Sequence, residues 1–156
     1  MFLAFEALNG RSGHDVGRAL LAKLYRQAAD TDLPEILCTA TGKPYFPDSG
    51  WHFSISHTKN HAFCVLAEHP VGIDAEETDR KIDPRLAHRY FSEIEQTRLR
   101  SDDDFLRLWV LKEATAKRSG RGIGNWLKTT AFHPDDNRIT IIDGCYVAVV
   151  EEYDAI

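Results

Sequence analysis

Several features that would assign the chain to common protein classes are missing from its 156 residues. No stretch approaches the roughly 20 apolar residues of a membrane-spanning helix, so we expect no membrane partner. Lys and Arg number 19 against 24 Asp and Glu, which leaves a formal charge of -5 and no basic field for nucleic acid. Residues 1–8 are apolar but contain Glu6 and lack a basic lead, unlike a signal peptide. We therefore expect a cytoplasmic protein.

Cysteine is scarce and forms no recognisable pattern. Cys38, Cys64 and Cys145 are an odd number at wide spacings, without a Cys-x-x-Cys pair or a zinc motif. Such residues indicate buried free thiols in a reducing compartment. With 43% hydrophobic and 28% charged residues, the chain has an ordinary globular composition, and its length suits one domain or two small halves that share a core.

The first part of the chain predicts strands around one helix. Residues 15–27 place apolar side chains at helical spacing, with basic residues between them. Alternating or apolar runs typical of strands occur at 1–8, 33–40, 51–56, 62–67 and 71–76. The runs at 51–56 and 62–67 indicate a hairpin, and residues 41–45 indicate a turn.

A charged, irregular segment at 78–83 is the expected boundary between two halves. Beyond it, Pro84 begins a helix that runs to about Tyr90, and Ser92 with Glu95 forms a capping box for the next helix. Asp102 begins a longer helix that ends at a pair of glycines. Strands are expected at 127–132, 138–142 and 145–151, the last two joined by the turn Asp143-Gly144. Helices followed by strands occur twice, which predicts an α+β fold of two similar halves, 1–78 and 79–156.

Two acidic segments carry the clearest chemical signal. Asp74 and Glu76 stand two apart in a segment expected to be extended, so their carboxylates point the same way. In the long helix, Trp109, Glu113 and Lys117 recur every four residues and share one face. Three carboxylates and one ammonium that converge can hold Mg²⁺ together with phosphate oxygens. Taken separately, each segment also fits solvated charge or an ordinary surface ion pair.

Five motifs in succession carry a resemblance to a known family. They are Gly42-Lys-Pro44, Phe53-Ser-Ile-Ser-His57, Gly72-Ile-Asp-Ala-Glu76, Phe91-Ser-Glu-Ile-Glu95 and the run from Trp109 to Lys117 followed by Gly120-Arg-Gly122. In this order they resemble the signatures of the 4′-phosphopantetheinyl transferases of the two-half, surfactin-synthetase-activating type. In the smaller, trimeric acyl-carrier-protein synthases the Asp motif lies close to the N-terminus, whereas here it lies near the middle of the chain. The resemblance therefore implies a pseudo-dimer within one chain, with the active site in the cleft between the halves, and we expect a monomer.

The resemblance also implies the reaction and the residues that perform it. The family transfers the 4′-phosphopantetheine arm of coenzyme A to a serine of a carrier protein, with Mg²⁺, and releases adenosine 3′,5′-bisphosphate. Asp74, Glu76 and Glu113 would bind the Mg²⁺ that holds the coenzyme A pyrophosphate, and Lys117 would make a second contact with its oxygens. These four are the expected catalytic residues. The expected coenzyme A contacts besides Lys117 are Gly42, Lys43 and Pro44 at the adenine, and Ser56 and His57 at the phosphates.

Some roles and readings stay open at this point. Glu76, directly or through a metal-bound water, and Glu95 are the two candidates for the general base, and Glu76 is favoured. Lys43 also fits a simple turn residue, and Trp109 is expected to pack beneath the site. The alternatives to the transferase are a coenzyme A or carrier-protein binding module without turnover, and another Mg²⁺-dependent phosphotransferase or hydrolase.

Overall fold

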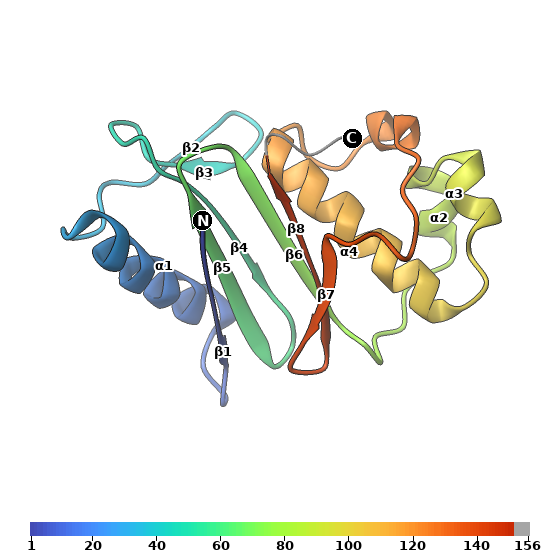
Figure 1. Ribbon diagram of the computed structural model, residues 1–156, viewed down its shortest axis with the longest axis horizontal. Coiled ribbons are helices and arrows are strands. Elements are labelled where there is room, and N and C mark those ends of the chain that lie inside the picture. The colour runs from blue at the N-terminus through green and yellow to red at the C-terminus, as the bar shows by residue number, and fades with distance from the viewer. Residues whose placement is uncertain (152–156) are drawn as a thin grey trace.

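Two three-stranded antiparallel sheets, each with a long helix on one face, form most of residues 1–151, the part of the chain that the computed structural model describes (Figure 1). The first unit contains β1 (Phe2–Ala7), α1 (Gly13–Ala29), β4 (His52–His57) and β5 (His61–Ala67). The second unit contains β6 (Val71–Glu77), α4 (Asp102–Ser119), β7 (Ile139–Ile142) and β8 (Cys145–Glu151).

Both units share one strand order. The sheets run β1-β5-β4 and β6-β8-β7, so in each the first strand lies at an edge and the last strand at the centre. In each, the helix follows the first strand and a hairpin follows the helix. The second occurrence of this pattern begins at Val71, because β6 pairs with β8 from Val71↔Glu151 to Glu77↔Cys145. This pairing crosses the boundary that the sequence suggested near residue 78.

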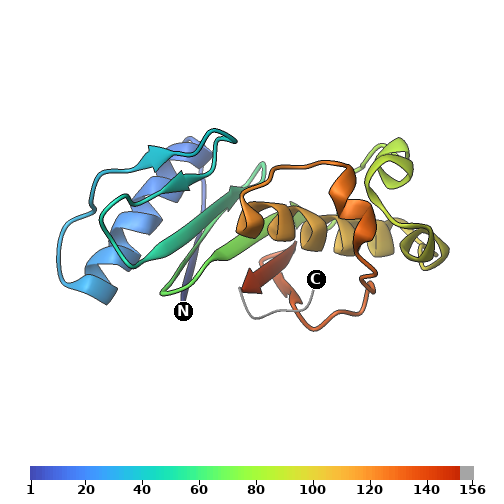
Figure 2. The same ribbon diagram turned by 90° about the horizontal axis from the view of Figure 1, so that it is seen from above.

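Shorter elements connect the main ones. The first unit inserts a small hairpin, β2 (Leu37–Cys38) with β3 (Pro44–Tyr45), before β4. The second unit inserts α2 (Arg85–Tyr90) and α3 (Glu93–Thr97) before α4, and the 3₁₀ helix η1 (Asn125–Thr129) after it. Figure 2 shows α2 and α3 at the outer end of the molecule, away from α1. Within residues 1–151, no helix is long and apolar enough to cross a membrane.

The sheets meet along β4 and β6 through side chains. Ser54 Oγ accepts a hydrogen bond from the Ile73 backbone N–H at 3.1 Å, and Ser56 Oγ accepts one from the Ala75 N–H at 3.2 Å. Two alternate residues of one strand thus satisfy two backbone donors of the other, in place of a backbone ladder. We call this junction of β4 with β6 the seam.

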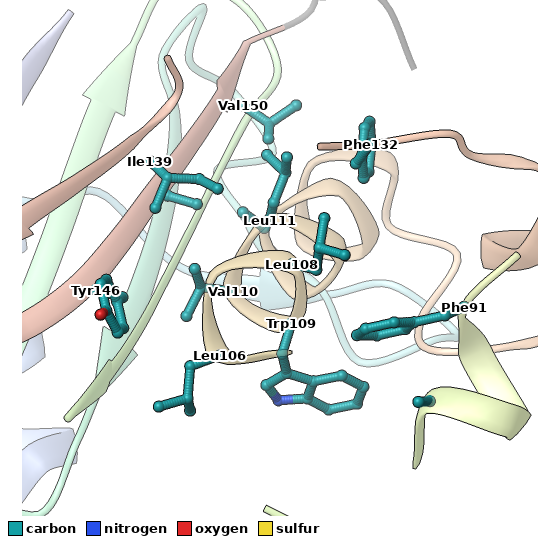
Figure 3. Packing of buried hydrophobic residues seen from close by; sticks show 13 residues of the cluster. Phe91, Leu106, Leu108, Trp109, Val110, Leu111, Phe132, Ile139, Tyr146 and Val150 are labelled. Atoms are coloured by element: carbon teal, nitrogen blue, oxygen red, sulfur yellow. The ribbon is translucent and has the colours of Figure 1, made fainter. Parts of the chain in front are cut away.

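Helix α4 lies unusually close to the second sheet because of one glycine. A Cβ at Gly72 would lie 2.0 Å from the Ala114 carbonyl oxygen, a distance that no side chain could occupy. Leu108, Trp109 and Leu111 of α4 lie in one apolar cluster with Phe91 after α2, Ile139 of β7 and Val150 of β8 (Figure 3). The helix is therefore fixed in position by apolar packing around it and by backbone contact beneath it.

Most of the elements expected from the sequence are confirmed. The strand at 33–40 is only the two residues of β2, because the surrounding chain is irregular. The strand expected at 127–132 is wrong, since that segment contains η1. Its backbone is held by a buried side chain instead of a neighbouring strand: Lys112 Nζ donates to the Leu127 carbonyl oxygen at 2.8 Å and to Thr130 Oγ1 at 2.5 Å.

Candidate functional site

Strand β6 presents two carboxylates beside the seam. Asp74 is only 3% exposed, and its Oδ1 atom accepts hydrogen bonds from Ser56 Oγ at 2.9 Å and from Lys117 Nζ at 2.7 Å. Its second oxygen, Oδ2, is buried without a hydrogen-bond partner among the described residues. Glu76 lies two residues further on, is also buried, and forms an ion pair with Arg80. The alternation of the strand thus brings both acids to one face, as the sequence predicted.

Helix α4 brings a third carboxylate and an ammonium to the same place. Glu113 and Lys117 lie one turn apart and line one cavity with Asp74 and Glu76. Burial and the neighbouring Asp74 carboxylate raise the pKa of Glu113 to about 8, although Lys117 opposes the shift. Burial likewise raises the pKa of Glu76, against the effect of its contact with Arg80. Negative charge at this position is therefore only partly compensated by the protein.

These residues fit a hard divalent cation. The donors are carboxylate oxygens, which Mg²⁺ prefers, and the buried Asp74 Oδ2 atom lacks the partner that such an atom normally has. A cation between Asp74, Glu76 and Glu113 would also offset the repulsion that raises the pKa of Glu113.

Two adjoining cavities surround the acidic residues. One, of about 300 Å³, contains the three carboxylates with Lys117 and Arg80. The other, of about 280 Å³, is more apolar and is lined by residues 41–44, Phe53 and Ile123. Ile55, Glu113 and Lys117 line both. The fold thus brings the predicted Gly42-Lys43-Pro44 motif next to the predicted acidic cluster.

The small hairpin of the first unit is fastened to the end of α4. Thr41 Oγ1 donates a hydrogen bond to the Gly120 carbonyl oxygen at 2.5 Å, and Lys43 Nζ donates one to the Arg118 carbonyl oxygen at 2.6 Å. Lys43 thus places a positive charge at the negative end of the helix dipole. Burial lowers the pKa of Lys43, and the nearby Arg118 lowers it further. Lys43 is therefore more than a turn residue, because it connects the two units.

Ser56 and His57 differ in their surroundings. Ser56 is buried, and its hydroxyl bonds Asp74 and the β6 backbone, so it orients the carboxylate. His57 is exposed and lines the acidic cavity, with its ring close to the start of α1. A Cβ at Gly13 would lie 2.5 Å from the imidazole, so only glycine allows this approach. A phosphate contact of either residue stays a prediction.

Glu95 and Trp109 have structural surroundings. The expected capping box is present: Ser92 Oγ accepts from the Glu95 N–H, and the Glu95 carboxylate accepts from the Ser92 N–H. Glu95 is fully buried and pairs with Lys112 Nζ at 2.6 Å. Its other oxygen accepts from Thr130 Oγ1 and from the Phe132 N–H. Glu95 does not line the acidic cavity, so the structure does not support it as the general base. Trp109 stacks near Phe91 and is a packing residue, as expected (Figure 3).

Sequence reasoning missed Arg80. It lies in the segment that was interpreted only as a boundary, yet it pairs with Glu76 and lines the acidic cavity. The available signal was its position four residues after Glu76, a spacing that predicts contact within a helix but not at the end of a strand. The prediction that all three cysteines are buried is confirmed only in part: Cys64 and Cys145 are buried, whereas Cys38 is exposed.

Comparison with known proteins agrees with this geometry. Residues 70–146, nearly half of the chain, match the model of the 4′-phosphopantetheinyl transferase superfamily. The 4′-phosphopantetheinyl transferase gsp of Aneurinibacillus migulanus is 33% identical over 131 residues, which cover 79% of this chain and 54% of that protein. Sfp of Bacillus subtilis is 37% identical over 89 residues, 53% of this chain and 39% of its own length.

A more distant organism provides a third relative. The L-aminoadipate-semialdehyde dehydrogenase-phosphopantetheinyl transferase of Xenopus laevis is 32% identical over 140 residues, 74% of this chain and 46% of that protein. The matched regions thus span about half the length of the curated relatives or less. The matched family region contains β6 and α4, the two elements that carry the acidic residues. These matches support placing the chain among the 4′-phosphopantetheinyl transferases, with gsp and Sfp as relatives.

Proposed function

We propose that the protein transfers the 4′-phosphopantetheine group of coenzyme A to a serine hydroxyl of a carrier protein, in a reaction that requires Mg²⁺. The observation that carries this proposal is the convergence of Asp74, Glu76 and Glu113 with Lys117 in one cavity, beside the cavity of the Gly42-Lys43-Pro44 motif. A pyrophosphate at the junction of the two cavities would extend its adenosine side toward the motif and its reacting phosphorus toward the carboxylates.

The donor is recognised by groups from both units. The apolar cavity around Phe53 and Pro44 suits an adenine ring, which binds mainly through its faces. Lys117 and Arg80 supply positive charge for the phosphate oxygens, and each is held in position by one of the site carboxylates. His57, exposed at the rim, is proposed as a further phosphate contact.

The metal site is proposed at Asp74, Glu76 and Glu113. Mg²⁺ bound there would neutralise charge on the transferred phosphoryl group and on the leaving phosphate. Ser56 keeps Asp74 Oδ1 in place by donating a hydrogen bond to it, whereas Oδ2 has no partner among the described residues and is available to ligate the metal ion.

The proton of the attacking serine is proposed to go to Glu76, either directly or through a water. Glu76 is 7% exposed and its pKa is raised by burial, so its carboxylate is a stronger base than an exposed one. The serine oxygen then forms the new bond to phosphorus, and the bond to the leaving adenosine 3′,5′-bisphosphate breaks.

The wider organisation of the protein follows the family. We propose that the repeated strand order reflects two similar halves arranged as a pseudo-dimer, with the site along the seam. The proposed partners are coenzyme A and a carrier protein, and the proposed state is a cytoplasmic monomer. The exposed side chains of Ile94 on α3 and Ile123 after α4 suit an apolar docking surface for the carrier.

Mass spectrometry of carrier proteins tests the transfer directly. Incubation with coenzyme A, Mg²⁺ and apo carrier proteins should add the mass of one phosphopantetheine group to the carrier. Excess EDTA, Asp74→Asn or Glu113→Gln should each reduce the rate by about 10²-fold to 10³-fold, the usual effect of losing one electrostatic contact to the reacting group. Glu68→Gln, at an exposed carboxylate between β5 and β6, is the matched control and should retain full activity.

Two results would argue against this proposal. Full activity in EDTA or in Glu113→Gln would contradict the metal assignment. Coenzyme A binding without any mass gain, across several acyl and peptidyl carriers, would favour the binding module without turnover.

A further inference from the structure

A second group of metal-ligating side chains lies on the opposite face of β6. Glu77 follows Glu76 in the strand and therefore points to the other side of the sheet. There it meets His61, at the start of β5, and Cys145, at the start of β8. His61 and Glu77 are largely buried, and Cys145 is fully buried. These three residues, which we call the His-Glu-Cys cluster, come from both units.

The distances in this cluster suit a small tetrahedral site. His61 Nδ1 lies 3.7 Å from Cys145 Sγ and 3.7 Å from Glu77 Oε1, and all three ligand atoms lie within 4.8 Å of one another. Bond lengths to zinc of about 2.0 to 2.3 Å imply separations of roughly 3.3 to 3.6 Å between tetrahedral ligands. Small side-chain movements would therefore bring all three atoms into coordination distance of one ion.

The surroundings of the cluster resemble the outer shell of a metal site. The other imidazole nitrogen, His61 Nε2, faces Asp143 Oδ2 at 3.8 Å, in the arrangement by which a carboxylate orients a metal-binding histidine. Glu77 Oε1 accepts hydrogen bonds from Thr58 Oγ1 at 2.7 Å and from the Asn60 N–H at 3.2 Å. A cavity of about 530 Å³ opens beside Glu77 and Thr58.

We propose that His61, Glu77 and Cys145 bind a Zn²⁺ ion. One imidazole, one thiolate and one carboxylate are a ligand set for a transition-metal ion, whereas the oxygen-only cavity around Asp74 suits Mg²⁺. The thiol proton of Cys145 is released to solvent when the sulfur coordinates, and water completes the fourth position. This proposal does not depend on the proposed transfer reaction.

The ion would connect the two sheets at the end of the seam. It joins β5 of the first unit to β6 and β8 of the second, through ligands that are up to 84 residues apart. It also fixes the end of β6 at the residue that follows Glu76. We therefore expect the bound ion to raise the thermal stability of the whole protein, because it binds the folded chain and not the separated segments.

Cobalt titration tests the site without an activity assay. Co²⁺ replaces Zn²⁺ at such sites, and a thiolate ligand gives an intense near-ultraviolet charge-transfer band. The titration is made in excess Mg²⁺, so that the oxygen-only site is occupied. We expect the band to saturate at one equivalent of Co²⁺ and to disappear when one equivalent of Zn²⁺ is added.

Variants identify the ligands. Cys145→Ser should abolish the band, and His61→Asn should weaken Co²⁺ binding by at least tenfold. Cys38→Ser, at the exposed cysteine, and His14→Gln, at an exposed histidine, are matched controls and should bind as wild type. Circular dichroism of each metal-free variant checks that it is folded.

A negative result with the wild type would be enough to overturn the proposal. Absence of the charge-transfer band at saturating Co²⁺ would mean that the cluster is only an ion pair between His61 and Glu77, with Cys145 as a neighbour. Persistence of the band in Cys145→Ser, or its loss in Cys38→Ser, would assign the thiolate to another cysteine and would equally overturn it.

Discussion

Helices α1 and α4 pack against sheets of the same strand order, but their buried faces differ in chemistry. The buried side chains of α1, among them Val16, Leu20 and Leu24, are apolar apart from the Tyr25 hydroxyl. Helix α4 buries Lys112 and Thr115 among its leucines and directs Glu113 and Lys117 to the seam. The first unit therefore provides an apolar interface and the Gly42-Lys43-Pro44 motif, whereas the second unit contains the three carboxylates and Lys117. One architecture thus supports either role, depending on the residues of a single helix.

The buried ion pair of the second unit gives the largest expected difference in stability. Lys112→Ala should destabilise the protein by about 3 to 5 kcal/mol, because it leaves Glu95 buried without its partner. Lys23→Met, at an exposed lysine of α1, should change the free energy of unfolding by less than about 0.5 kcal/mol. Urea unfolding of both variants measures the contrast.

The double variant Lys112→Met with Glu95→Leu sharpens this test. Replacing both charges by apolar groups should recover much of the loss, since no charge is then left unpaired. The Phe132 N–H would lose its acceptor, so recovery should be incomplete. A double variant as unstable as Lys112→Ala would show that the lost hydrogen bonds of Lys112 and Glu95, not the unpaired charge, determine the cost.

The next largest difference is expected from glycine substitutions at the two helix-sheet interfaces. Gly72→Ala should cost about 3 kcal/mol, the upper end for overpacking, because the added methyl group meets the Ala114 carbonyl of α4. Gly17→Ala in α1 should cost less than about 1 kcal/mol. Its methyl group meets only the Ile55 side chain, and alanine favours the helix by about 1 kcal/mol.

Gly50→Ala is the neutral reference, because a Cβ there contacts nothing within 4 Å. Thermal unfolding of the three variants gives the order, and the transfer assay should show reduced activity for Gly72→Ala, whose α4 must move. Equal costs for Gly72→Ala and Gly17→Ala would mean that the two helices are equally free to shift on their sheets.

Removing the charge of Glu113 should stabilise the folded protein at high pH. A carboxyl group with a pKa near 8 in the folded protein and 4.5 in the unfolded chain contributes stability below about pH 4.5. That contribution is lost as the pH rises through 8. At pH 9, without divalent ions, Glu113→Gln should therefore be more stable than wild type by about 1 kcal/mol, or roughly 2 to 4 °C in Tm.

Differential scanning calorimetry at pH 5 and pH 9 measures this difference, which should be smaller at pH 5. Saturating Mg²⁺ should stabilise the wild type more than the variant at the higher pH. A variant that is less stable than wild type at pH 9 in EDTA would contradict the excess of negative charge at this position.

Salt should have the smallest effect. The chain is itself acidic, with a formal charge of -5, so docking of a carrier protein cannot depend on a favourable net charge. With exposed Ile94 and Ile123 as the proposed contacts, affinity should fall only a few-fold between low and physiological salt. Surface plasmon resonance across a salt series checks this. A steep loss would indicate that a few basic residues steer the carrier instead.

The acidic site was predictable where it depended on local periodicity. Alternation in a strand relates Asp74 to Glu76, and helical spacing relates Glu113 to Lys117, so each pair could be recognised in isolation. Periodicity could not show that the two pairs come together in the fold; that prediction rested on the order of the motifs. Arg80 was missed because its contact with Glu76 is made outside any helix.

Elements determined by distant partners were not predictable. The segment at 127–132 has the composition of a strand, but the buried Lys112 binds its carbonyl and hydroxyl oxygens. Strand β6 was assigned to the first half, although its backbone partner, β8, lies at the end of the described chain. The His-Glu-Cys cluster carried no spacing signal for the same reason, since its ligands come from three separate strands.

Because serine side chains hold the seam together, single substitutions can change the width of the site. A backbone ladder does not depend on side-chain identity, so point mutations rarely alter the distance between paired strands. Here that distance depends on the hydroxyl groups of Ser54 and Ser56. Substitution at these two positions should therefore change the width of the site, while both sheets and the acidic residues of the cavity stay the same.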